Sequence, residues 1–208
     1  MKLVVLGATG GTGLEIVRQA ITAGHAVTAF VRSPDRLQPF RNSIDIRQGD
    51  LLSRSELQKV VERQDAVLSA FGPRVPVAKG DENLLQTFAA ALTEAMLAAR
   101  VKRLVMESVA FLFKDALFPP AYLLGKLLFP AVVKDAAAME QIVQNSPLDW
   151  TLVRPPRLTD HPRSGNYRVR QGHLPRFGLS ISRADVADCF LKAVADRTTV
   201  KKVLGVTN

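Results

Sequence analysis

Short apolar runs alternate with longer helical patterns along the whole chain. Runs rich in β-branched residues predict buried strands at residues 2–6, 26–31, 44–48, 66–71, 102–108, 150–154 and 202–206, the last as an edge strand. Periodic apolar positions predict helices at residues 12–23, 82–99 and 134–145. Ser53 with Glu56, and Ser182 with Asp185, predict the capped starts of two more helices, the second running to about residue 196.

Strands separated by crossover helices form a parallel sheet with helices on both faces. The pattern therefore predicts an α/β fold: a single Rossmann-like, doubly wound domain over residues 1–208, with a mostly parallel sheet of roughly seven strands. Three less regular segments, 73–81, 110–133 and 155–181, each follow a predicted strand. We expect them to gather at the carboxyl edge of the sheet, where open α/β folds bind ligands, with the last two as substrate-side loops.

The segment 110–133 is the most apolar in the chain, but charged residues and three prolines interrupt it. A membrane-spanning helix needs roughly 20 uninterrupted apolar residues, so no transmembrane span is predicted. The N-terminus runs directly into a glycine motif without the features of a secretory signal. The single cysteine, Cys189, excludes an internal disulfide and suits a cytoplasmic protein.

The stretch GATGGTG, residues 7–13, lies between a predicted strand and a predicted helix, which is the context of a dinucleotide-binding loop. Gly7 permits the tight turn, Gly10 lets the backbone approach a pyrophosphate, and Gly13 lets the helix lie close to the sheet. The N–H groups at the helix start then face the phosphates, and hydroxyl groups add donors. The candidate phosphate-binding residues are Gly7, Thr9, Gly10, Gly11, Thr12 and Gly13.

The end of the second predicted strand decides between the two dinucleotides. NAD sites place Asp or Glu there to accept from the ribose 2′-hydroxyl, whereas this chain has Arg32, with Arg36 following. A guanidinium forms charge-assisted bonds to a 2′-phosphate, so these arginines favour NADP. The alternative is that Arg32 is an ordinary solvated surface residue.

Two further strand ends supply candidates for the rest of the cofactor. Asp50, with Leu51 beside it, stands where an adenine amino group can be met after the third predicted strand. Ala70, Phe71 and Gly72 follow the fourth and should run beside the cofactor.

The formal net charge of +9 and the sequence pI of about 10.1 raise the question of nucleic-acid binding. The basic residues are dispersed, however, and their densest stretch, 154–183, has few aromatic residues and no nucleic-acid motif. We therefore expect an anionic small ligand and no nucleic-acid partner. The three histidines, His25, His161 and His173, have no metal-ligand spacing, so no metal site is expected.

Several motifs agree with one another: GATGGTG, the VR at 31–32, the GD at 49–50, ESVAF at 107–111 and DWTLVRPPRLTD at 149–160. Together they resemble the atypical short-chain dehydrogenase/reductase superfamily, and within it the NAD(P)H-binding NmrA-like and flavin (biliverdin-IXβ) reductase-like group. The resemblance covers essentially the whole chain. It implies NADP along the sheet edge, with the nicotinamide near Ser108 and the backbone after Pro155 and Pro156.

Where biliverdin-reducing relatives carry histidines, this chain has Arg157 and Ala136. That difference speaks against tetrapyrrole reduction, and Arg157 favours an anionic substrate or the cofactor phosphates. The superfamily's active site combines a Ser with a Tyr-x-x-x-Lys pair, in which the Lys lowers the pKa of the Tyr that transfers a proton. Ser108, Tyr122 and Lys126 match this set as candidate catalytic residues. The alternative is that the apolar segment around Tyr122 is a lid or wall of the substrate pocket.

These features favour an NADPH-dependent reductase that transfers a hydride to a small apolar or conjugated substrate, such as a quinone, a flavin or a carbonyl compound. The alternative is a non-catalytic, NADP(H)-sensing regulatory protein, as NmrA-like relatives imply. A third interpretation, an epimerase or dehydratase of a nucleotide-linked sugar, leaves little room for a substrate domain in 208 residues. We expect a monomer or a homodimer.

Overall fold

A computed structural model describes residues 1–72, 83–113 and 130–208. These residues form an eight-stranded sheet in the order β3-β2-β1-β4-β5-β6-β10-β8. Its strands are β1 (Lys2–Leu6), β2 (Ala26–Val31), β3 (Asp45–Gln48), β4 (Ala66–Ser69), β5 (Arg103–Glu107), β6 (Asp149–Arg154), β8 (Arg168–Gln171) and β10 (Lys202–Thr207). All the pairings are parallel except the one between β8 and β10. The prediction of a doubly wound, mostly parallel α/β sheet is confirmed.

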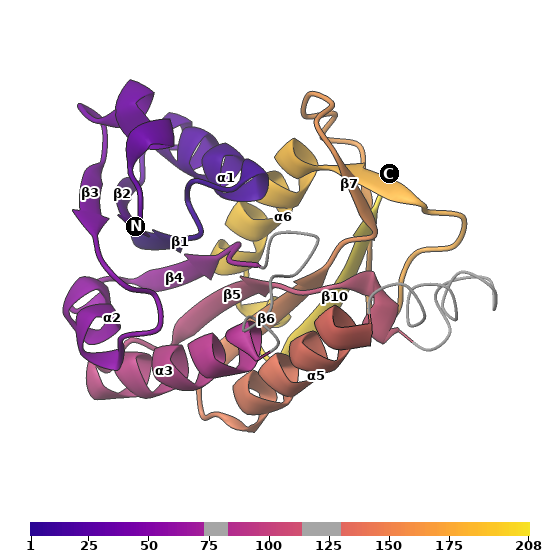
Figure 1. Cartoon of the computed structure of the whole chain (residues 1–208). Helices are drawn as coiled ribbons and strands as arrows, with labels where there is room; N and C mark the ends of the chain where they lie inside the picture. Colours follow the sequence, from indigo (N-terminus) through magenta and orange to yellow (C-terminus); the bar gives the residue numbers. More distant parts are fainter. Residues whose placement is uncertain (73–82, 114–129) are drawn as a thin grey trace.

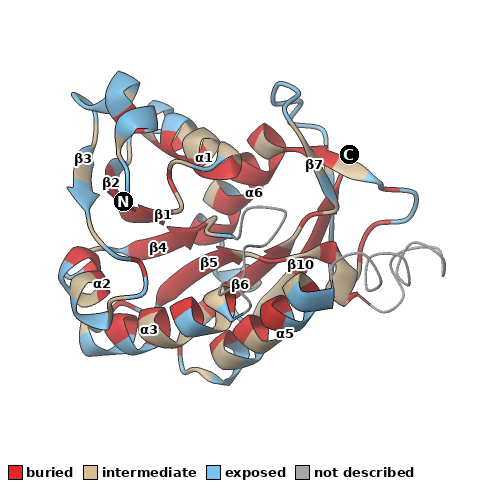
Figure 2. Cartoon of the chain, viewed as in Figure 1, coloured by how far each residue is buried: buried red, intermediate tan, exposed pale blue. Residues whose placement is uncertain are grey.

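Helices cover both faces of the sheet (Figure 1). One face carries α1 (Gly11–Thr22) and α6 (Arg183–Ala195), and the other carries α2 (Arg54–Val61), α3 (Leu84–Ala98) and α5 (Pro130–Asn145). Along β1, Leu3 and Val5 pack toward the first pair of helices, while Val4 and Leu6 pack toward the second group. The central strands are consequently buried on both sides, as Figure 2 shows, because alternate side chains enter different cores.

The C-terminal part of the sheet differs from the prediction. The strand β10 lies between β6 and β8, so its assignment as an edge strand was wrong. The segment 155–181 was expected to be irregular, but it contains β8 and also β7 (Arg157–Thr159), which pairs in parallel with β9 (Ser180–Ser182) in a separate two-stranded sheet. The four residues of β8 are all exposed, so no apolar pattern marks them, and the hydrogen bonds to β10 define the strand.

Helix starts follow the predicted capping residues with one difference. The Ser182 hydroxyl accepts from the Asp185 N–H at 2.9 Å, as predicted. The Ser53 hydroxyl accepts from the Glu56 N–H, but the Glu56 carboxylate accepts from the Asp50 N–H at 2.9 Å instead of returning to Ser53. Three short 3₁₀ helices complete the described structure: η1 (Asp35–Phe40), η2 (Ala110–Leu112) and η3 (Arg197–Thr199).

The start of α3 is capped by a side chain from another helix. The buried Asp135 of α5 accepts hydrogen bonds from the N–H groups of Leu85, at 2.7 Å, and Gln86, at 3.0 Å. Asn83, at the N-cap position of α3, makes no side-chain capping bond. The Asp135 carboxylate therefore satisfies two backbone donors that the first turn of a helix leaves free, and it fixes α5 against α3.

Replacing Asp135 with Ala should lower the free energy of unfolding by about 2 kcal/mol, because two amide groups at a largely buried helix start lose their acceptor. Urea denaturation followed by circular dichroism measures the change. Asp45→Ala is the matched control, since Asp45 forms an exposed ion pair with Arg47 and its loss should change stability by no more than about 0.5 kcal/mol. Equal effects of the two substitutions would contradict the capping role.

Candidate functional site

The strand order of the main sheet reverses between β1 and β4, and a cleft of about 470 Å³ opens at the carboxyl ends of these strands and of β5. Open α/β sheets bind ligands at this switch point. The described residues that line the cleft are Gly11, Thr12, Ala70, Phe71, Gly72, Leu85, Glu107, Ser108, Val109, Val132, Ala136, Met139, Leu158 and Arg183. Residues from the two ends of the chain thus meet in one cleft.

Backbone contacts that tolerate no side chain form the glycine loop. Gly7 has a φ of +74°, and a Cβ there would lie 2.6 Å from the carbonyl oxygen of Ala70. A Cβ on Gly13 would lie 2.1 Å from the carbonyl oxygen of Gly7. The Gly10 N–H donates to the same Gly7 oxygen at 2.9 Å. Glycine at these positions lets α1 begin in direct contact with the end of β1.

The N-terminus of α1 has the properties of an anion-binding site. Its N-cap residue, Gly10, has no side chain to occupy the first N–H groups, and its first turn contains no acidic residue. Leu14 donates to the Gly10 carbonyl at 2.9 Å, so the N–H groups of residues 11–13 precede this first helical bond. Gly11 and Thr12 line the cleft. The helix dipole and these donors together can hold a phosphate group.

One of the two arginines after β2 contacts this loop. Arg32 and Arg36 are both exposed, and the Arg36 Nη1 donates to the carbonyl oxygen of Thr9 at 2.6 Å. This bond joins η1 to the glycine loop and holds one guanidinium beside it. Both residues are exposed after the carboxyl end of β2, where an anionic group can reach them.

After β3, Asp50 and Leu51 have clear local roles. Asp50 is exposed, and its Oδ1 accepts from the Leu52 N–H at 2.9 Å, which stabilises the turn into α2. Leu51 is buried in the core beneath α2 and α3. The bond from Leu52 uses Oδ1 of Asp50, so its other carboxylate oxygen, Oδ2, is left for a ligand.

Ser108 is a buried hydroxyl in the wall of the cleft. Its N–H donates to the Val153 carbonyl at 2.8 Å, which extends the pairing of β5 with β6, while its Oγ has no hydrogen-bond partner among the described residues. A buried hydroxyl without a partner costs free energy unless a ligand engages it. Ser108 therefore lines the cleft with a hydroxyl donor that a ligand can engage.

Glu107, at the end of β5, is a cleft residue that the sequence analysis missed. Burial raises the pKa of its carboxyl to about 7, although a hydrogen bond with the Thr12 side chain and the nearby Arg183 guanidinium both act to lower it. The only sequence signal was an acidic residue at a strand end directly before Ser108, and that signal alone does not separate a buried acid from a solvated one.

Arg183, the first residue of α6, is a second cleft residue that the sequence analysis did not select. Its Nη1 donates to the Asp160 carboxylate at 2.6 Å. A Cβ on Gly11 would lie 2.5 Å from the Arg183 Cδ, so this side chain lies across the glycine loop. The start of α6 thus contributes a cation directly beside the start of α1.

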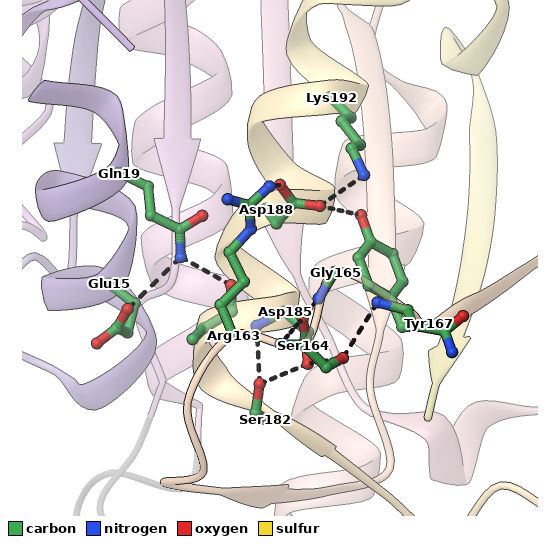
Figure 3. Close-up of polar contacts among 12 residues, drawn as sticks. Glu15, Gln19, Arg163, Ser164, Gly165, Tyr167, Ser182, Asp185, Asp188 and Lys192 are labelled. Carbon is green, nitrogen blue, oxygen red and sulfur yellow. Dashed lines mark hydrogen bonds and ion pairs between the residues drawn. The ribbon is translucent and has the colours of Figure 1, made fainter. Parts of the chain in front are cut away.

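A polar cluster holds the loop 160–167 against α6, as Figure 3 shows. The buried Asp185 accepts from the N–H groups of Ser164 and Gly165, both at 2.9 Å. One turn further along α6, Asp188 accepts from the Tyr167 hydroxyl at 2.7 Å and pairs with Arg163. These contacts fix the residues that follow Asp160, the partner of Arg183.

Apolar side chains from three elements form the remaining wall. They are Leu85 of α3, Val132, Ala136 and Met139 of α5, Leu158 of β7, and Val109. Ala136, which the sequence analysis singled out, lies in this wall. This wall joins directly to Ser108, so the cleft has one polar half and one apolar half.

Other predicted residues lie elsewhere. Pro155, Pro156 and Arg157 are not among the lining residues, and Arg157 is exposed on β7. The Pro155 carbonyl accepts from the Ala110 N–H at 3.1 Å, which anchors the backbone beside Ser108. Tyr122 and Lys126 lie outside the described residues.

The described part of the chain contains neither a candidate metal site nor a candidate membrane-spanning helix. Within residues 1–72, 83–113 and 130–208, no group of three or more His, Cys, Asp or Glu side chains has the arrangement of a metal site. In the same ranges no helix has the length and apolar character to cross a membrane. Cys189 is buried in α6, where burial raises the pKa of its thiol to about 12.

Comparison with known proteins agrees with the site geometry. Residues 7–197 match a family model described as NAD(P)H-binding. The uncharacterized protein YwnB of Bacillus subtilis is 28% identical over 181 residues, which cover 81% of this chain and 78% of YwnB.

Solved structures share the fold over the whole chain. A short-chain dehydrogenase/reductase from Veillonella parvula, solved in complex with NADP, is 18% identical with a TM-score of 0.81, covering 100% of this chain and 94% of that one. ChuY, an anaerobilin reductase from Escherichia coli O157:H7, is 19% identical with a TM-score of 0.80, covering 100% and 97%. At these identities the likeness demonstrates the common fold.

Replacing Gly13 with Ala should lower the free energy of unfolding by about 1–3 kcal/mol, because the new Cβ overlaps the backbone carbonyl of Gly7. Gly11→Ala is the matched substitution in the same turn: its Cβ meets the Arg183 side chain, which can rotate away, so stability should stay within about 1 kcal/mol of the parent. Thermal and urea unfolding compare the two. A Gly13→Ala protein as stable as the parent would contradict the close contact.

Proposed function

The chain belongs to the NAD(P)H-binding family, and we propose that it is an NADPH-dependent reductase of a small apolar or conjugated substrate of the quinone, flavin or carbonyl type. The observation that carries this proposal is the two-part cleft. Its polar half contains the start of α1, and its apolar half joins a buried hydroxyl that lacks a partner among the described residues.

In this proposal the dinucleotide lies along the carboxyl edge of the sheet. The glycine loop holds the pyrophosphate, aided by the hydroxyl groups of Thr9 and Thr12. Arg32 and Arg36 bind the 2′-phosphate, which makes NADP the preferred form. The adenine lies near Asp50 and Leu51, and residues 70–72 run beside the ribose of the nicotinamide. Support comes from the exposed guanidinium groups after β2 and from the absence of an acid in the first turn of α1.

The reaction takes place at the junction with the apolar half. When bound, the reduced dinucleotide supplies a hydride, and the substrate acceptor also takes one proton from solvent, so that a quinone becomes a hydroquinone. The Ser108 hydroxyl donates a hydrogen bond to the acceptor oxygen and orients it. Pro155, Pro156 and Arg157 stay predictions for the backbone and charge around the nicotinamide. Tyr122 and Lys126, the predicted catalytic pair, stay a prediction as an alternative source of that proton.

The assignment to one domain over residues 1–208, the monomeric or dimeric state and the cytoplasmic location also stay predictions. The expectation that the protein binds no nucleic acid is likewise still a prediction.

A second candidate function is an NADP(H)-sensing protein without turnover. This candidate is supported by the ionisable side chains that line the described part of the cleft. They are Glu107 and Arg183, with no Tyr, Lys or His among them. An acid–base pair of the superfamily type is therefore missing from the described wall. The turnover experiment below separates the two functions.

Replacing Arg32 with Ser should weaken NADPH binding by roughly 10-fold or more and leave NADH binding nearly unchanged, because a charge-assisted bond to the 2′-phosphate is lost. Tryptophan or NADPH fluorescence titration gives both dissociation constants. Arg197→Ser is the control, since Arg197 is 82% exposed and pairs with Asp149 at the opposite edge of the sheet. Equal losses for the two nucleotides, or for the two variants, would contradict the assignment of NADP.

The enzyme should oxidise NADPH in the presence of at least one member of a panel of quinones, flavins and aldehydes, measured as loss of absorbance of the reduced nicotinamide. Ser108→Ala should then lower kcat by about 10-fold or more, because the oriented hydrogen bond to the acceptor is lost, with little change in NADPH affinity. Tight NADPH binding with no oxidation across the whole panel would favour the sensor instead.

A further inference from the structure

We propose that Glu107 is a positioning residue for the dinucleotide: it holds the Thr12 side chain in the free protein and takes up one proton from solvent when the pyrophosphate reaches the glycine loop. The inference rests on the proposed function, because it concerns the same cleft. It adds a proton to the binding step and makes NADP affinity depend on pH near neutrality.

The first step is the position of the carboxyl group. Glu107 ends β5 and lines the cleft together with Thr12, which belongs to the first turn of α1. The two side chains share a hydrogen bond, so Glu107 is linked directly to the loop that the proposed function assigns to the pyrophosphate. A half-buried carboxylate at this place faces the same positive helix end that an incoming phosphate needs.

The second step is the charge around Glu107 in the described part of the chain. Among the groups on the packed elements, Arg183 of α6 acts on the carboxyl, and this arginine is shared with Asp160. On the neighbouring β6, Arg154 pairs with Glu140. On α1, Glu15 pairs with Arg18. On α6, Asp185 accepts from Ser164 and Gly165, and Asp188 pairs with Arg163 and Lys192. On α5, Asp135 accepts from Leu85 and Gln86, and Lys134 is exposed.

The third step is the consequence of ligand binding. Burial already raises the pKa of Glu107 to about 7, so the free protein is a mixture of the charged and neutral forms near neutral pH. A pyrophosphate at the start of α1 adds negative charge beside Thr12 and draws Arg183 toward itself. Both effects disfavour the carboxylate, so its pKa rises further and a proton binds. The neutral Glu107 then donates to the Thr12 hydroxyl, whose own hydrogen turns to a phosphate oxygen.

The sign of the pH dependence follows from linkage. The form that binds NADP tightly is the protonated one, so affinity is greatest below the pKa of the free protein and decreases as pH rises through about 7 and above. At most, the dissociation constant increases roughly tenfold for each pH unit, as long as Glu107 stays protonated in the complex. The 2′-phosphate itself titrates near pH 6, so the comparison starts at about pH 7.

The experiment is isothermal titration calorimetry of the full chain with NADP⁺ from about pH 7 to pH 9, in two buffers that differ in ionisation enthalpy. For the parent protein we expect uptake of roughly half to one proton and a dissociation constant that rises by up to about tenfold per pH unit. Glu107→Gln, which keeps an acceptor for Thr12, should show no uptake and a flat profile. Glu94→Gln, an exposed acid on α3, should behave as the parent does.

Each outcome has a definite meaning. Superimposed profiles for the parent and Glu107→Gln, or no proton uptake by the parent, would overturn this inference and leave the proposed function intact. If NADP⁺ fails to bind the parent at every pH, the proposed function falls and this inference falls with it. Should Glu107→Gln fail to fold, proton uptake by the parent alone still decides, because that measurement needs no variant.

Discussion

The contact between the start of α1 and the end of β1 is the constraint on which the site depends. Gly13 lies so close to the carbonyl of Gly7 that a Cβ would overlap it, and Gly7 adopts a positive φ against the backbone of Ala70. The helix therefore begins directly at the carboxyl edge of the sheet, with its first N–H groups directed at the cleft. Since α6 packs beside α1, the same contact also brings Arg183 across the loop.

Buried carboxylates from distant segments hold the other walls of the cleft. Asp135 joins α5 to α3, and Asp185 joins the loop 160–167 to α6. In both cases the acid accepts from backbone N–H groups that regular secondary structure leaves free, so its burial is balanced by hydrogen bonds. Glu107 differs, because burial outweighs the hydrogen bond with Thr12 and the attraction of Arg183. That imbalance makes it responsive to a new charge in the cleft.

The division of the cleft into a polar and an apolar half explains how the proposed reductase would bind both a cofactor and a substrate. In the polar half, helix N–H groups and arginine side chains can bind phosphates. In the apolar half, Met139, Leu85 and Leu158 can contact a flat or apolar substrate. Ser108 lies where the halves meet and contributes the oriented hydroxyl. Such a site fixes the position of the acceptor group through the Ser108 hydroxyl. It selects less strongly among substrates, because the hydrophobic contacts of the apolar wall have no preferred direction.

The sequence by itself determined the parallel α/β architecture, the glycine loop and the exposed arginines after β2, because these features depend on residues adjacent in the chain. Strands of continuous apolar residues are recognisable one at a time, as β1 and β2 were to the residue. The sequence could not reveal β8, because its exposed residues carry no apolar pattern and its partners in β10 lie 33 to 39 residues further along the chain.

Nor could the sequence identify Glu107, Arg183 or the helix-capping role of Asp135. Each is a common charged residue whose significance comes from neighbours distant in the chain. Only the tertiary structure brings β5, α1 and α6 to the same edge of the sheet. Desolvation at this edge raises the pKa of the Glu107 carboxyl, and it is a property of the assembled cleft rather than of any local sequence pattern.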